Sequence, residues 1–211
     1  IQLMEFSKEF KQALSQFSPK EKDKLIFRLL KKDKLLSKKL YFELIEEETT
    51  DDKRNTMESY LKERITDLSK HIGNPKYFLV LVRKLSGEIT EHVKVTTDKF
   101  GDVFLNLFLV NTILEHNDKL SRQRFDAVYK LYIYLINKII KALIQIQKLD
   151  EDYWLEFDEI LTDIDFQLHE NLYLEKLCIN NGLDFNWLKS ENIPDHFELI
   201  VKDIRSQGFL K

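Results

Sequence analysis

The sequence is poor in the two residues that most often form turns. It contains five Gly and three Pro among 211 residues, about a third of the roughly 12 % that the two contribute on average. A chain with so few turn-formers is poorly suited to a many-stranded barrel or sandwich, and it leaves little room for Gly-rich phosphate-binding loops. No linker rich in Gly, Pro or Ser interrupts the chain. We therefore expect a single domain over residues 1–211.

Cysteine and long apolar runs are also scarce. The only cysteine, Cys178, excludes an intramolecular disulfide and favours a reducing, cytoplasmic location. The longest apolar stretch, residues 131–146, is interrupted by Asn137, Lys138 and Lys141, so no membrane span is expected. The net charge of −3, from 33 basic and 36 acidic side chains, predicts no general attraction to polyanions.

The chain is instead rich in apolar residues at helical spacing. Phe6, Phe10, Leu14 and Phe17 follow one another at steps of four, four and three, and Ser18 with Glu21 forms the pattern of a capping box. Further helices are expected over residues 34–46, 51–72, 100–114, 118–148, 152–169, 172–180 and 194–206. We predict an all-α fold, either a multi-helix antiparallel bundle or a solenoid-like α-α array of about eight to ten helices.

Three segments bear on how these helices pack. Residues 77–95 fit either a hairpin turning at Ser86-Gly87 or one helix, and the helical spacing of their apolar residues favours the helix. Residues 100–114 have almost no polar face and predict the most buried helix. Residues 118–148 carry a single narrow polar stripe, so we expect neighbours on most sides and expect this helix to lie beside 100–114.

The sequence contains no recognisable catalytic, cofactor or metal motif. No two of its five histidines are closer than 21 residues, and the pair Glu88 and His92 is of a kind that arises readily by chance. P-loop, dinucleotide-binding and nucleophile-elbow patterns are absent. A carboxylate acid/base pair has no sequence signature. Catalysis therefore stays open, but we expect a non-catalytic protein with no cofactor and no metal.

Charge is distributed unevenly along the chain. Residues 1–44 hold eleven basic and six acidic side chains, a net charge of +5, whereas residues 150–175 hold ten acidic side chains and no Lys or Arg. Within the basic part, Lys31, Lys34 and Lys38 fall at helical spacing and are candidate contacts to a phosphate backbone. The alternative is a solvated face, which the excess of 26 Lys over 7 Arg supports.

Aromatic residues are abundant, with 15 Phe, 8 Tyr and 2 Trp. Most Phe positions fall on apolar stripes and are expected in the core, whereas Trp187 and Phe185 are candidate anchors of an interface. Our first hypothesis is a non-catalytic interaction or scaffold module that presents helix faces or a groove to an unidentified protein partner. The second is a nucleic-acid-associated helical protein that uses the basic N-terminal third, with an enzymatic site in a helical groove as a further option.

Overall fold

The computed structural model of the chain describes residues 6–210 and is helical throughout, with no strand among these residues. This confirms the all-α, multi-helix fold. Where the sequence predicts one domain, the chain forms two compact units, Ile1–Glu47 and Glu48–Lys211. Each unit is described by itself.

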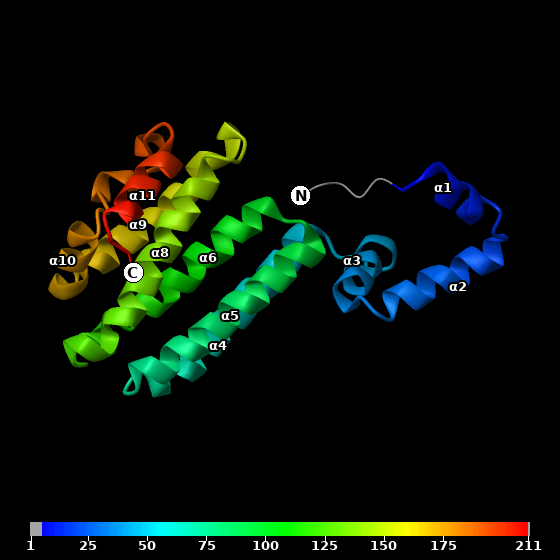
Figure 1. Cartoon of the computed structure of the whole chain (residues 1–211). Coiled ribbons are helices and arrows are strands. Elements are labelled where there is room, and N and C mark those ends of the chain that lie inside the picture. Colours follow the sequence, from blue (N-terminus) through cyan, green and yellow to red (C-terminus); the bar gives the residue numbers. More distant parts are fainter. Residues whose placement is uncertain (1–5, 211) are drawn as a thin grey trace. The chain divides into compact units, whose positions relative to one another are not determined.

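Between residues 6 and 47 the first unit contains three short helices, shown in blue in Figure 1. They are α1 (Lys8–Ser15), α2 (Pro19–Leu30) and α3 (Lys34–Leu44). The predicted capping box is present, because Ser18 Oγ accepts from the backbone N–H of Glu21 while the Glu21 carboxylate accepts from the backbone N–H of Ser18. Pro19 at the first helical position completes this helix start.

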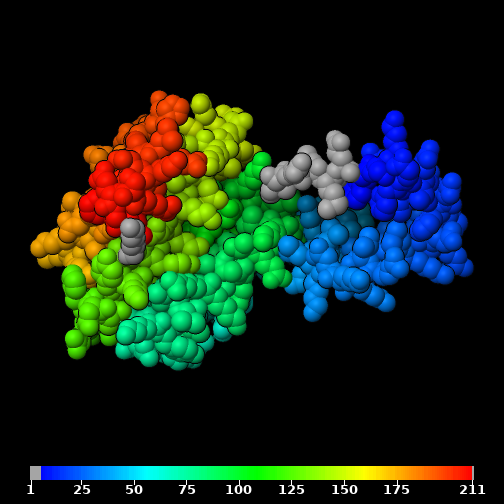
Figure 2. Space-filling view, in the orientation of Figure 1, coloured from blue at the N-terminus to red at the C-terminus, as the bar shows by residue number. Residues whose placement is uncertain are grey.

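The second unit is a helical bundle (Figure 1), and Figure 2 shows one face of its surface, coloured from cyan to red. Its α-helices are α4 (Thr50–Leu68), α5 (Pro75–Thr96), α6 (Lys99–Leu114), α7 (Asn117–Leu120), α8 (Phe125–Ile146), α9 (Asp158–His169), α10 (Leu172–Asn180) and α11 (Phe197–Ser206). Four 3₁₀ segments connect them: η1 (Ser69–His71), η2 (Glu151–Phe157), η3 (Phe185–Trp187) and η4 (Ser190–Asn192). Helices α4 and α5 pack against each other as a hairpin, and α10 and α11 pack against α8.

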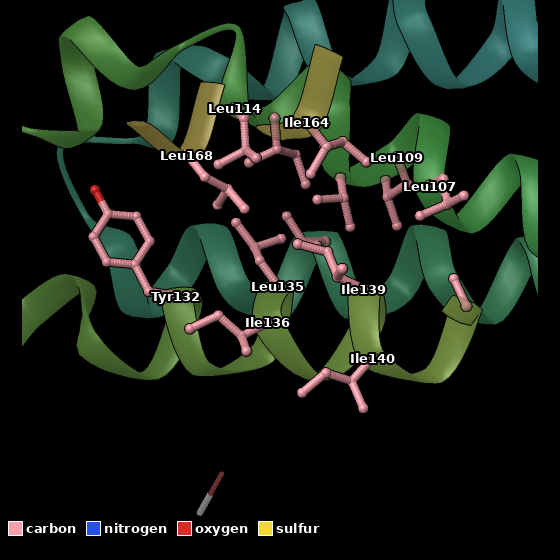
Figure 3. Close-up of a cluster of buried hydrophobic side chains, with 14 of the residues drawn as sticks. Leu107, Leu109, Leu114, Tyr132, Leu135, Ile136, Ile139, Ile140, Ile164 and Leu168 are labelled. Atoms are coloured by element: carbon pink, nitrogen blue, oxygen red, sulfur yellow. The ribbon is translucent and has the colours of Figure 1, made fainter. Parts of the chain in front are cut away.

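Helix α6 lies at the centre of this unit, in contact with α4, α5, α8 and α9. Its predicted burial is confirmed, because ten of its residues are buried, and α8 packs beside it as expected. Figure 3 shows where α6, α8 and α9 meet. The side chains labelled there are buried and come from all three helices: Leu107, Leu109, Leu114, Tyr132, Leu135, Ile136, Ile139, Ile140, Ile164 and Leu168.

Two segments bear on the helices predicted from the sequence, residues 77–95 and residues 118–148. Residues 77–95 are helical and belong to α5, which confirms the helix over the hairpin. The single helix expected over 118–148 is wrong, because residues 121–124 separate α7 from α8. Arg124 takes an extended conformation there, with φ −62° and ψ 138°. Without Gly or Pro in this stretch, the sequence does not indicate the break.

None of the helices among residues 6–210 has both the length and the apolar character that a membrane span requires.

Candidate interaction surface and polar clusters

The helices of the first unit begin at well-formed caps. The Ser7 hydroxyl accepts from Phe10 N at 3.3 Å, and the Asp33 carboxylate accepts from Leu36 N at 3.0 Å. Each cap satisfies a backbone donor that the helix start would otherwise leave free. Local sequence alone therefore accounts for where these helices begin.

The first unit has no hydrophobic core among its described residues. Helices α2 and α3 pack against each other, yet none of residues 6–47 is buried. Ten large apolar side chains are more than a third exposed, and we call them the first-unit apolar surface. They are Phe6, Phe10, Phe17, Ile26, Phe27, Leu29, Leu36, Tyr41, Leu44 and Ile45. Exposed apolar patches often mark interaction sites, so these side chains are candidates for one.

This surface corrects one expectation from the sequence. The apolar stripe of residues 6–17 predicts that its Phe residues lie in the core, but Phe6, Phe10 and Phe17 are exposed by 54 %, 47 % and 41 %. Phe6 and Phe10 stack on each other, with ring centroids 5.1 Å apart. Only Phe10 lies within α1, because Phe6 precedes the cap Ser7 and Phe17 follows the end of the helix, and nothing among the described residues buries the three rings.

The three lysines predicted to contact phosphates lie on the same unit. Lys31 ends α2, Lys34 begins α3, and Lys38 lies one turn further along α3. All three are exposed. They lie close in sequence to Leu29 and Leu36 of the first-unit apolar surface, so basic charge and exposed apolar side chains occur together on these helices.

The two predicted aromatic anchors lie in η3 of the second unit and are only half-buried. The Trp187 ring packs edge-on against buried Phe197, with centroids 5.0 Å apart, whereas the Phe185 ring stacks on His169 at 4.5 Å. Each ring therefore already has a neighbour within the unit. Whether either binds a partner stays a prediction.

Phe185 also lines a small cavity of about 330 Å³ beside α9. Within it, His169 Nε2 lies 3.5 Å from Asp165 Oδ1, and His169 Nδ1 lies 2.8 Å from Glu175 Oε1 outside the lining. Two carboxylates thus hold the imidazole in place. No cluster of three or more His, Cys, Asp or Glu side chains among the described residues has a geometry that fits a metal ion.

A second polar cluster is enclosed between α6 and α8. The Lys138 ammonium donates to Asn106 Oδ1, and Asn106 Nδ2 donates to Asp102 Oδ1 at 3.0 Å. Gln145 Nε2 donates to Asp102 Oδ2 at 2.6 Å. Burial, reinforced by repulsion from Lys141, lowers the pKa of Lys138 from 10.5 to about 8. Because these side chains bond to one another across the two helices, the cluster joins α6 to α8.

The starts of α4 and α6 line a wider cavity of about 610 Å³. Arg54 Nε donates to buried Asp98 at 2.7 Å, its Nη2 lies 3.0 Å from Asp51, and its guanidinium lies 4.6 Å from the centroid of the Phe100 ring. Asp98 also caps α6 by accepting from Gly101 N at 2.8 Å. Because these charges already satisfy one another, the cavity offers no spare charged group from this cluster.

The pair Glu88 and His92 does not form a site. The Glu88 carboxylate accepts from Tyr60 Oη at 2.9 Å, whereas His92 is half-buried and its burial lowers the pKa of the imidazole. The free Cys178 thiol is buried, which raises its pKa to about 12 and keeps it protonated. These groups are part of the packing of the second unit.

Comparison with protein-family models, with curated proteins and with solved structures finds no match for this chain.

Proposed function

We propose that this protein is a non-catalytic interaction module and that the first-unit apolar surface is where a protein partner binds. One observation carries the proposal: ten large apolar side chains are exposed on a unit in which no residue between 6 and 47 is buried. A helical unit this small, without a core, disulfide or metal among its described residues, lacks the interactions that stabilise small domains. Covering its apolar side chains with a partner supplies the missing burial. The buried free thiol of Cys178 fits a reducing, cytoplasmic location.

Site-specific photo-crosslinking tests the proposal. A benzophenone amino acid replaces Phe27, which is 61 % exposed, and in a matched control it replaces Leu199 of α11, which is 62 % exposed. Both proteins are irradiated in extract of the native cells, and protein adducts are identified by mass spectrometry. We expect defined adducts at position 27 that do not form at position 199. Equal adducts at the two positions, or none at either, contradict the proposal.

A second candidate function is binding to a nucleic-acid backbone through Lys31, Lys34 and Lys38. The observation that favours it is that all three side chains are exposed. The affinity for duplex DNA or RNA is then expected to fall steeply with salt, and reversal of all three lysines to Glu is expected to lower it further. Binding that is undetectable at physiological salt, or that the triple reversal leaves unchanged, removes this candidate.

A further inference from the structure

We propose that the partner of the first-unit apolar surface is a second copy of this chain, which presents an acidic surface on α9. This inference rests on the proposed function and names the partner. The α9 acidic surface consists of Glu159, Asp163, Phe166 and Glu170, which follow one another at steps of four, three and four. All four are exposed, with Phe166 exposed by 62 %.

The α9 acidic surface faces away from the core of its unit. The opposite side of the helix holds the buried residues Ile160, Leu161, Ile164 and Leu168. Among the described residues, Glu159, Asp163 and Glu170 have no ion pair, and residues 150–175 contain no Lys or Arg. Phe166 thus lies between acidic side chains that form no ion pair among the described residues.

Further apolar side chains are exposed close to this surface along the chain. Leu155 in η2 and Leu172 at the start of α10 are exposed by 72 % and 71 %. The acidic region therefore combines negative charge with apolar side chains that have lost little contact with water. This combination is typical of a protein interface, in which apolar contacts supply affinity and charged rims select the partner.

The first unit carries the complementary combination. Its exposed side chains Phe27, Leu29 and Leu36 occur with the exposed lysines Lys31 and Lys34, in a region with a net charge of +5. One contact between two copies would cover apolar side chains on both surfaces and bring opposite charges together. An anionic membrane would account for the basic surface alone, leaving Phe166 and its acidic neighbours without a partner, so the second copy is favoured.

The test is analytical ultracentrifugation of the full chain and of two charge-reversal variants. The first variant is Lys31→Glu with Lys34→Glu, and the second is Glu159→Lys with Asp163→Lys. We expect wild type to associate as its concentration rises and to dissociate with added salt. Each variant is expected to associate roughly tenfold more weakly, because attraction becomes repulsion at two positions. A protein with all four reversals is expected to regain association, since the complementarity is then restored with exchanged signs.

A matched pair of apolar variants tests the centre of the contact. Phe166→Ser is expected to weaken association, whereas Leu199→Ser, which removes an equally exposed side chain from α11, is expected to leave it unchanged. Circular dichroism checks that every variant keeps its helix content. We expect no loss, because substitutions at exposed positions rarely affect folding. Recovery of association in the four-reversal protein independently shows that the reversed chains fold.

Several results overturn the inference. They are a wild-type monomer at all concentrations, association that neither reversal affects, and failure of the four-reversal protein to recover. Flotation with phosphatidylserine vesicles is run in parallel. If wild type is a monomer that binds these vesicles, and the first-unit charge-reversal variant does not bind them, the surface is assigned to membranes instead. If the purified chain is monomeric but crosslinks from position 27 identify another protein, the proposed function stands and only the second copy is excluded.

Discussion

Replacing Lys138 by Met tests how the polar cluster between α6 and α8 affects stability. In the folded chain the pKa of Lys138 falls from 10.5 to about 8, mainly through burial. The unfolded chain therefore binds more protons between pH 8 and pH 10.5, so the contribution of this group to the free energy of unfolding rises with pH over that range. A shift of this size corresponds to about 3 kcal/mol.

In the Met variant, position 138 does not titrate. The substitution also leaves Asn106 Oδ1 without its donor, which costs about 1–3 kcal/mol at every pH. The absolute difference from wild type at pH 7 thus mixes two effects of opposite sign, whereas the change of that difference with pH isolates the lysine. We expect wild type to gain about 3 kcal/mol relative to Lys138→Met between pH 7 and pH 10.5.

Urea unfolding followed by circular dichroism measures this difference at intervals across the pH range. Burial raises the pKa of Tyr132 to about 12, but this group is common to both proteins and cancels in the comparison. Lys130→Met is the matched control, because Lys130 is an exposed lysine on the same helix. The difference in free energy of unfolding between wild type and Lys138→Met is expected to change with pH, whereas the difference for Lys130→Met is not. If neither difference changes with pH, the assignment of Lys138 to a desolvated cluster is refuted.

Three further experiments test the packing of the second unit and its contrast with the first. Arg54→Met is expected to cost about 3–5 kcal/mol of stability, because it leaves buried Asp98 without its ion pair. Adding Asp98→Asn is expected to recover part of this loss. If the two losses measured by urea unfolding simply add, the residues are not coupled. Asn171→Ala is expected to lower stability by about 2–4 kcal/mol, because Asn171 caps α10 and also donates to the hydroxyl of buried Tyr132. A thermal midpoint equal to that of wild type would exclude this role. Ile139→Ala, in the core, is expected to cost about 2–5 kcal/mol of stability. Leu44→Ala is expected to cost less than about 0.5 kcal/mol in the isolated chain, because Leu44 is 74 % exposed. Equal losses in chemical unfolding would mean that the first-unit apolar surface is covered.

The spacing of apolar residues is sufficient to predict most helices and which of them is most buried. The helix over residues 77–95 follows from steps that persist through Ser86-Gly87, because an isolated glycine costs a helix only about 1 kcal/mol. The gap between α7 and α8 could not be predicted, since residues 121–124 lack Gly and Pro, the residues whose presence most often signals the end of a helix.

Spacing is less informative about what covers a helix face. Lys138 lies on the polar stripe predicted for residues 118–148, yet the structure packs it against Asn106 of α6. Conversely, the stripe that includes Phe10 and Phe17 is as apolar as a core stripe, yet it stays exposed. In both cases the outcome depends on which element packs against that face, and periodicity within one helix carries no information about its neighbours.

The contrast between the two units links stability to binding. Helix α6 is covered by four other helices of its own unit, so the core of the second unit needs no partner to exclude water. The first unit has capped helices but no buried residue between positions 6 and 47, so under the proposed function its partner would supply the apolar contacts that hold those helices together. A partner that binds only the folded form stabilises it in proportion to the logarithm of partner concentration. Folding of residues 6–47 is therefore expected to depend on partner concentration, whereas folding of the second unit is not.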